Sequence, residues 1–249
     1  GRDLMAAGEF EASGNGQPPC PYGACDGNGW ILNEDGSATE CRCRQPRLAK
    51  ARASGVNSVL PKRYRGVSFD RPPVTEIHPG AVTVVRDWIE RLDENLDQGN
   101  GLWLMGDTGT GKTTLAMLVS KEALRRDHTV AIYSMPSLLT RIRATYGAEA
   151  GEESYDQFFE RLCEVDLLHI DDLGAEKQTE WVLEQLYALV NERYEREKSI
   201  VVTTNITDQG ELEQQIGPRT VSRLTEMCGE SVVPLFGEDA RQKPQLRDG

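Results

Sequence analysis

The stretch from Gly106 to Thr113, with the sequence GDTGTGKT, constrains the fold of this chain more than any other feature. It satisfies the pattern G-x-x-x-x-G-K-[ST], which is the phosphate-binding loop of nucleotide hydrolases. The glycines allow the backbone to curl so that several N–H groups point at one anion. Lys112 can then reach the terminal phosphates, and the Thr113 hydroxyl can ligate a Mg²⁺ ion.

The segments on either side of this loop have the character that the motif requires. Residues 102–105 are apolar and typical of a buried strand, whereas residues 114–126 indicate a helix. The N-terminus of that helix would add its partial positive charge to a phosphate site. A glycine-rich turn can match the pattern by chance, but these flanking elements favour nucleotide binding. The predicted nucleotide-binding residues of this region are Gly106, Asp107, Thr108, Gly109, Thr110, Gly111, Lys112, Thr113 and Thr114.

From Val67 onward, predicted strands and helices alternate, which is the pattern of a parallel sheet covered by helices on both faces. Pro234 cannot donate a backbone N–H, so we expect the last strand to lie at an edge of the sheet. We expect the other strands at 129–133, 165–170 and 199–203, and the last at 232–236. We expect the other helices at 81–92, 137–143, 155–162, 180–197, 212–216 and 220–227.

Polar residues follow two of these strands where ligands bind in open α/β sheets, at the carboxyl ends. Asp171 and Asp172 follow the strand 165–170; Asp171 suits the Mg²⁺ shell, and Asp172 is placed to orient the attacking water. Asn205 ends the next strand and can contact the water or the terminal phosphate. The alternatives are an acidic strand end before a turn, and an Asn that only caps a helix or fills a turn.

Two arginines lie near the predicted helix 220–227, after the Asn205 strand: Arg219 directly precedes this helix, and Arg223 lies on it. Arginine at this place is suited to a finger that stabilises the charge on a transferred phosphate, and we favour Arg223. If a neighbouring subunit supplies it, hydrolysis requires oligomerisation. The alternative is that both arginines are surface or salt-bridge residues.

These elements in this order resemble the AAA+ ATPases, and in detail they are similar to the helicase-loader branch that includes DnaC, DnaI and IstB. The resemblance covers roughly residues 67–245. It implies a P-loop AAA+ sheet with a reduced lid, because only 26 residues follow Arg223. It also implies that Arg223 acts in trans and that the late Arg241 contacts the nucleotide as a second sensor. Many relatives have Glu at the place of Asp172, so the reach of this carboxylate differs.

The resemblance implies an ATP-dependent replicative-helicase loader of a bacterium or phage, with ATP and Mg²⁺ as cofactors. Its expected partners are a hexameric replicative helicase, single-stranded DNA and further copies of itself, which assemble on ATP or DNA. One alternative is a transposition helper like IstB, and another is a zinc-bearing adaptor that uses nucleotide as a switch and hardly hydrolyses it. No run is long enough for a membrane span, and residues 1–19 lack the apolar core of a signal peptide, so we expect a cytoplasmic protein without a membrane partner.

Four of the six cysteines lie close together before the ATPase region, at Cys20, Cys25, Cys41 and Cys43. In a cytoplasmic protein such a cluster more often holds structural zinc than a disulfide. So short a segment cannot build a stable core unaided, which also favours a metal. Reduced cysteines without a ligand, a disulfide or an iron–sulfur site are the alternatives. We expect Cys163 and Cys228 in or near the packed core.

The charge of the chain is −12, but its distribution is uneven. Residues 41–65 contain eight basic and no acidic residues, so this segment is +8 and the remainder of the chain carries −20. Such a segment suits nucleic acid or an acidic partner surface, or else it is a solvated linker. We therefore expect a disordered segment at 1–19, a zinc-like module of four cysteines with a basic linker at 20–66, and the AAA+ domain at 67–249.

Overall fold

The computed structural model describes residues 20, 22–25, 30–32, 37–43, 60–149 and 151–237. The chain separates into two compact units, Gly1–Gly55 and Val56–Gly249. The predicted disorder of residues 1–19, most of the basic segment, and residues 238–249 with Arg241 lie outside the described residues. The predicted domain boundaries at 19 and 66 stay predictions.

The second unit is built around a five-stranded parallel sheet with the order β4-β5-β6-β3-β7. This confirms the predicted α/β architecture and the edge position of Pro234. The strands are β3 (Leu102–Gly106), β4 (Val130–Ser134), β5 (Leu167–Asp171), β6 (Ser199–Thr204) and β7 (Val232–Leu235). The helices are α2 (Pro79–Glu90), α3 (Leu92–Asp97), α4 (Lys112–Arg125), α5 (Met135–Thr145), α6 (Tyr155–Glu164), α7 (Glu180–Glu195), α8 (Gln209–Ile216) and α9 (Pro218–Cys228).

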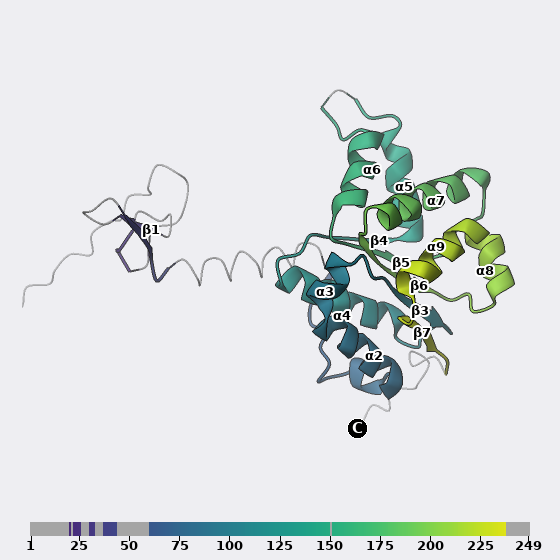
Figure 1. Ribbon diagram of the computed structural model, residues 1–249, viewed down its shortest axis with the longest axis horizontal. Helices are drawn as coiled ribbons and strands as arrows, with labels where there is room; N and C mark the ends of the chain where they lie inside the picture. The colour runs from purple at the N-terminus through teal and green to yellow at the C-terminus, as the bar shows by residue number, and fades with distance from the viewer. Residues whose placement is uncertain are drawn as a thin grey trace, which may run out of the picture. The chain divides into compact units, whose positions relative to one another are not determined.

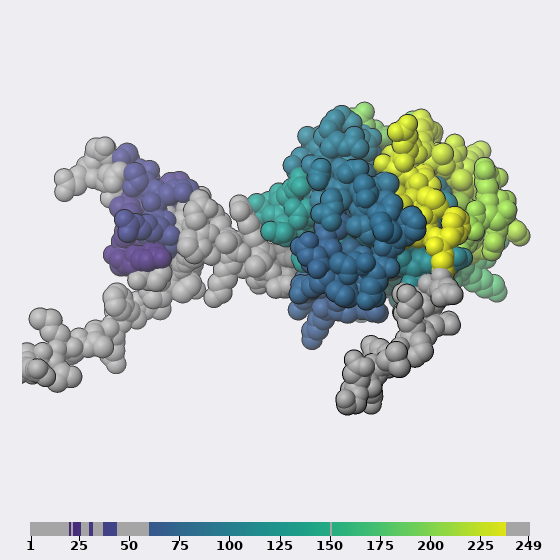
Figure 2. Space-filling model, turned by 90° about the horizontal axis from the view of Figure 1, so that it is seen from below, coloured from purple at the N-terminus to yellow at the C-terminus, as the bar shows by residue number. Residues whose placement is uncertain are grey.

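Helices cover both faces of this sheet, as Figure 1 shows. On β3, Leu102 and Leu104 pack into a core with α2, α3 and α4. Trp103, between them in sequence, joins the opposite core with α5 to α9. Because side chains alternate along a strand, one continuous apolar run supplies both cores. In Figure 2 the α2 region, in blue, adjoins the yellow end of the described chain at β7.

Several predicted boundaries were wrong by a few residues. The largest difference is that one predicted helix is two helices in the structure. The predicted helix 81–92 divides at Arg91, which has φ −96° and ψ 25° and links α2 to α3. In a continuous helix the Trp88 carbonyl would pair with the N–H of Leu92, but here it accepts a 2.9 Å hydrogen bond from the side chain of Asn95. At the other end of the chain, the last strand stops at Leu235, one residue before the predicted end.

Two short 3-10 turns precede α2, and both lie beside the loop that carries the phosphate motif. They are η1 (Lys62–Tyr64) and η2 (Val74–Glu76). Leu60, just before η1, is only 1% exposed and packs against Met117 of α4. The end of the basic segment is therefore part of the second unit.

The first unit contains a short antiparallel hairpin of β1 (Trp30–Leu32) and β2 (Ala38–Glu40). Its described core consists of cysteines with Ile31. Cys163 and Cys228 are buried in the second unit, as predicted. In the parts of the chain that the structure describes, no helix combines the length and apolar character needed to span a bilayer.

Candidate functional site

Two glycines of the phosphate motif have backbone geometry that other residues rarely adopt. Gly106 has φ 139°, and a Cβ on it would lie 1.9 Å from the carbonyl oxygen of Leu235. Gly111 has φ 97°, caps α4, and a Cβ there would lie 2.4 Å from Cδ1 of Ile77. Glycine at these positions lets the loop pass close to β7 and to the turn before α2. The backbone N–H of Asp107 also bonds Leu235 O at 3.0 Å.

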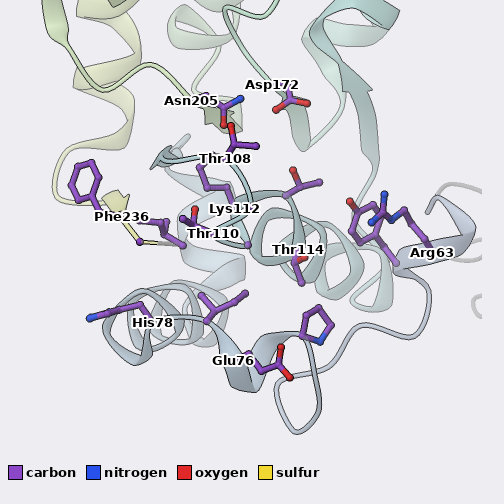
Figure 3. Close-up of a pocket in the computed structure, with 18 residues that line it drawn as sticks. Arg63, Glu76, His78, Thr108, Thr110, Lys112, Thr114, Asp172, Asn205 and Phe236 are labelled. Carbon is purple, nitrogen blue, oxygen red and sulfur yellow. The ribbon is translucent and has the colours of Figure 1, made fainter. Parts of the chain in front are cut away.

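The loop forms one wall of a pocket of about 640 Å³, shown in Figure 3. Seven of the nine predicted loop residues line it, namely Thr108, Gly109, Thr110, Gly111, Lys112, Thr113 and Thr114. Asp172 and Asn205, from the ends of β5 and β6, also line the pocket. In the view of Figure 3 they lie on one side of Lys112, with Glu76 and His78 on the other. The structure thus brings the predicted residues of three segments to one cavity.

The Lys112 ammonium group is held inside the loop. Its Nζ donates to the carbonyl oxygens of Gly106 at 2.9 Å and Asp107 at 2.6 Å, and the residue is 5% exposed. A buried cation requires such acceptors or an anion, because losing water is costly for it. These two carbonyls therefore keep a positive charge in the pocket wall, where it can meet a phosphate.

A carboxylate and a hydroxyl that could share a Mg²⁺ ion are in direct contact. Thr113 donates its hydroxyl to Oδ1 of Asp171 at 2.8 Å. Thr203 donates to the same oxygen at 2.7 Å, and its own hydroxyl oxygen accepts the backbone N–H of Asp172 at 2.9 Å. Hydroxyl and carboxylate oxygens are the hard donors that Mg²⁺ prefers, so this pair fits the metal.

Thr203 contacts the predicted site residues but was not itself predicted as one, because its partners Asp171 and Asp172 lie on a different strand end. Through its two bonds Thr203 fixes Asp171 and the start of the Asp172 turn together. Asp172 itself has a positive φ of 57°. Such a conformation is uncommon for a non-glycine residue and occurs often at functional sites.

The pocket also has a wall that the motif did not indicate. Arg63 and Tyr64 of η1 line it, and the Arg63 guanidinium lies 5.0 Å from the centre of the Tyr64 ring. Ile77 and Phe236 add apolar surface, and Phe236 is 62% exposed. The sequence does not predict this wall, because the contact depends on how the end of the basic segment packs against the ATPase domain.

The structure does not bring every predicted residue to this pocket. Arg223 lies on α9 and is not among the residues that line the cavity. Its side chain instead contacts Asn191 and Tyr194 of α7 and Glu226 of α9.

The four cysteines of the first unit converge. Their Sγ atoms all lie within 4.8 Å of one another, with 3.6 Å between Cys20 and Cys41 and 3.5 Å between Cys25 and Cys43. A tetrahedral zinc site with Zn–S bonds of ~2.3 Å places its sulfurs about 3.8 Å apart, so the cluster fits zinc. None of the six cysteines of the chain is in a disulfide.

Burial works to raise the pKa of the Cys20 thiol, but several neighbouring groups outweigh this effect. Hydrogen bonds from the backbone N–H groups of Tyr22, Ala24 and Cys25, together with one from the Cys41 side chain, lower that pKa to about 6. The thiolate is the form that binds a metal, so these N–H groups favour the ligand state of Cys20.

The sequence model of a protein family, the IstB-like ATP-binding proteins, matches residues 88–245 of this chain. The chain belongs to this family. The match includes the phosphate loop, Asp171, Asp172, Asn205 and Arg223. Membership places the pocket described above in a family of ATP-binding proteins, and it confirms the resemblance that the motifs indicated.

Individual relatives of this chain are distant in sequence. It is 26% identical over 228 residues to the phage-like element PBSX protein XkdC of Bacillus subtilis, covering 85% of this chain and 80% of that protein. It is 24% identical over 198 residues to the replicative helicase loader DnaC of Escherichia coli, covering 79% and 78%.

Solved structures show the same fold. The crystal structure of the DnaC helicase loader has a TM-score of 0.58 at 24% identity, covering 72% of this chain and all of that one. The replication initiator DnaA bound to AMPPCP and single-stranded DNA also has a TM-score of 0.58, at 23% identity. The match covers 72% of this chain and 51% of that chain.

The wall formed by η1 generates a prediction about nucleotide affinity. We expect Arg63→Ala and Tyr64→Ala each to weaken ATP binding by ~3- to 10-fold, because each removes a cation or a ring from the wall of the pocket. Lys62→Ala is the matched control, since Lys62 is in the same turn and is not among the lining residues. Equilibrium binding of a fluorescent ATP analogue measures the change; equal affinities for the control and both variants would contradict the role of this wall.

Proposed function

We propose that this chain is an ATP-dependent helicase loader, which binds ATP and Mg²⁺ in the pocket and delivers a hexameric replicative helicase to single-stranded DNA. The observation that carries the proposal is the convergence of Lys112, Thr113, Asp172 and Asn205 on one cavity in a chain of this family. Asp171 is hydrogen-bonded to Thr113 at the edge of this group. The DnaC relative, named a replicative helicase loader, supports the choice of process.

The chemistry follows from the placement of each group. Lys112 and the backbone N–H groups of the loop bind the phosphates, and Thr113 with Asp171 would hold Mg²⁺, which neutralises charge on the phosphate oxygens. Asp172 accepts a hydrogen bond from the attacking water and orients it toward the terminal phosphate. Asn205 contacts that phosphate from the neighbouring strand and distinguishes ATP from ADP.

A complete site needs a positive charge on the far side of the terminal phosphate. We assign this role to Arg223 of a neighbouring subunit, because Arg223 lies outside the pocket of its own chain. Assembly on ATP or DNA would then switch on hydrolysis. Arg241 is proposed as a second contact with the nucleotide from within the same chain.

The first unit is proposed as the arm that contacts the helicase, with zinc as its structural ion. Cys20, Cys25, Cys41 and Cys43 would provide a closed tetrahedral site, which has no open position for catalysis. Single-stranded DNA is proposed as the polymer on which subunits assemble. The DnaA structure, which has the same fold and contains single-stranded DNA, supports this choice.

The cysteine cluster generates a prediction about metal content. We expect the purified full-length chain to contain one zinc per chain, and Cys43→Ser to lose it because three thiolates no longer close the tetrahedron. Cys163→Ala is the control, since Cys163 is buried in the other unit. Elemental analysis of the dialysed proteins measures the ratio. Metal-free wild-type protein that keeps its fold would rule out a structural zinc.

The proposed helicase partner generates a prediction about complex formation. We expect the full-length chain to co-purify with the replicative helicase of its host, more strongly with ATP than without nucleotide. A chain that begins at Val56 should keep ATP binding, because it retains the η1 wall of the pocket, but lose the helicase. Lys112→Ala is the converse control, which removes nucleotide binding and leaves the first unit intact.

Two outcomes would overturn the loader assignment. One is co-purification with a transposase and not with the helicase, which would favour a transposition helper of the IstB type. The other is a complex with the helicase that is unchanged when the first unit is removed, which would reject the proposed arm.

A further inference from the structure

Arg223 is held in one position by three side chains from two helices. Its Nε donates to Oδ1 of Asn191 at 3.1 Å, and its Nη1 donates to a carboxylate oxygen of Glu226 at 3.1 Å. The guanidinium carbon lies 4.2 Å from the centre of the Tyr194 ring, which is within the range of a cation–π contact. A long side chain that is one-third exposed would otherwise sample many rotamers.

These contacts form a closed cycle between α7 and α9. The Tyr194 hydroxyl donates to the other carboxylate oxygen of Glu226 at 2.5 Å, so the ring under Arg223 is itself fixed by the partner of Arg223. This hydrogen bond to the carboxylate raises the pKa of Tyr194, and the phenol therefore stays neutral and keeps its proton as donor. Asn191 and Tyr194 are three residues apart on α7, as are Arg223 and Glu226 on α9, so each pair shares a helix face.

Arg219, one turn earlier on α9, provides an internal comparison. It is exposed, and its guanidinium carbon lies 5.9 Å from the centre of the Tyr187 ring, with no side-chain hydrogen bond or ion pair among the described residues. Both arginines thus lie over tyrosines of α7, but only Arg223 is also tied by hydrogen bonds to its neighbours. Of the two candidate arginines, Arg223 is therefore the one whose side chain is held by hydrogen bonds.

We infer that Asn191, Tyr194 and Glu226 are positioning residues that preorganise Arg223 for insertion into the nucleotide site of a neighbouring copy. This inference rests on the proposed trans role of Arg223. The two hydrogen bonds use two of the five N–H donors of a guanidinium, so donors on Nη1 and Nη2 are left for a phosphate. Holding the group in place beforehand removes the entropy cost of ordering it when the transition state forms.

The test uses ATP hydrolysis by the full-length chain at a concentration that saturates assembly, with single-stranded DNA present. We expect Tyr194→Leu to lower kcat by ~5- to 10-fold, since it removes both the ring and the hydroxyl that anchor the cycle. Tyr194→Phe keeps the ring and should lower kcat by ~2- to 3-fold. The KM for ATP should be unchanged, because none of these residues lines the pocket.

Tyr187→Leu is the matched control, since it removes the ring under Arg219 from the same helix and should leave kcat unchanged. A mixing experiment separates positioning from general damage. Asp172→Asn subunits cannot orient the water but carry an ordered Arg223, so mixing them with Tyr194→Leu subunits should raise activity above that of either variant alone. A fold defect in the Tyr194→Leu subunits would not be rescued in this way.

The outcomes distinguish this inference from the function on which it rests. If Arg223→Ala hydrolyses ATP like the wild type, the proposed finger itself is wrong. If Arg223→Ala is inactive and is rescued by Asp172→Asn subunits, while Tyr194→Leu has wild-type kcat, the finger stands and the positioning role is overturned. Equal losses of kcat in Tyr187→Leu and Tyr194→Leu would also overturn it.

Discussion

The Asp171 carboxylate is the point at which the phosphate loop is joined to the sheet. One of its oxygens accepts the hydroxyl of Thr113 from α4 and the hydroxyl of Thr203 from β6. Thr203 also accepts the N–H of Asp172, so a single cluster aligns the loop helix, the acidic strand end and the neighbouring strand. The same alignment fixes the elements that carry Lys112 and Asn205, and both of these residues line the pocket.

Long, strongly patterned elements could be predicted from the sequence, although not their exact boundaries. The polar residues that follow the strands could be predicted as well. The strand–loop–helix order around Gly106, the acidic end of β5 and the edge position of Pro234 follow from local rules. The break at Arg91 could not be predicted, because it depends on a side chain, Asn95, that takes a helix carbonyl. Such competition is decided by packing and not by the pattern of apolar residues.

The same distinction applies to the site. The glycines and Lys112 follow from a motif, since the motif describes contacts within one short segment. Tyr64 could not be assigned to the pocket from the sequence, because its position depends on the packing of Leu60 against α4. The motif favours Arg223 over Arg219, but it could not predict that Asn191 of α7 and Glu226 of α9 hold the Arg223 side chain. Interactions between distant segments are what the sequence alone left open.

We propose that one chain holds only part of a hydrolytic site and that a second copy completes it. The most direct test is the rate of Mg²⁺-dependent ATP hydrolysis per subunit, measured over a series of protein concentrations with the assembly state followed by light scattering. We expect a rate per subunit that is near background for monomers and rises with the fraction assembled. A rate per subunit that stays constant down to concentrations at which the chain is monomeric would contradict it.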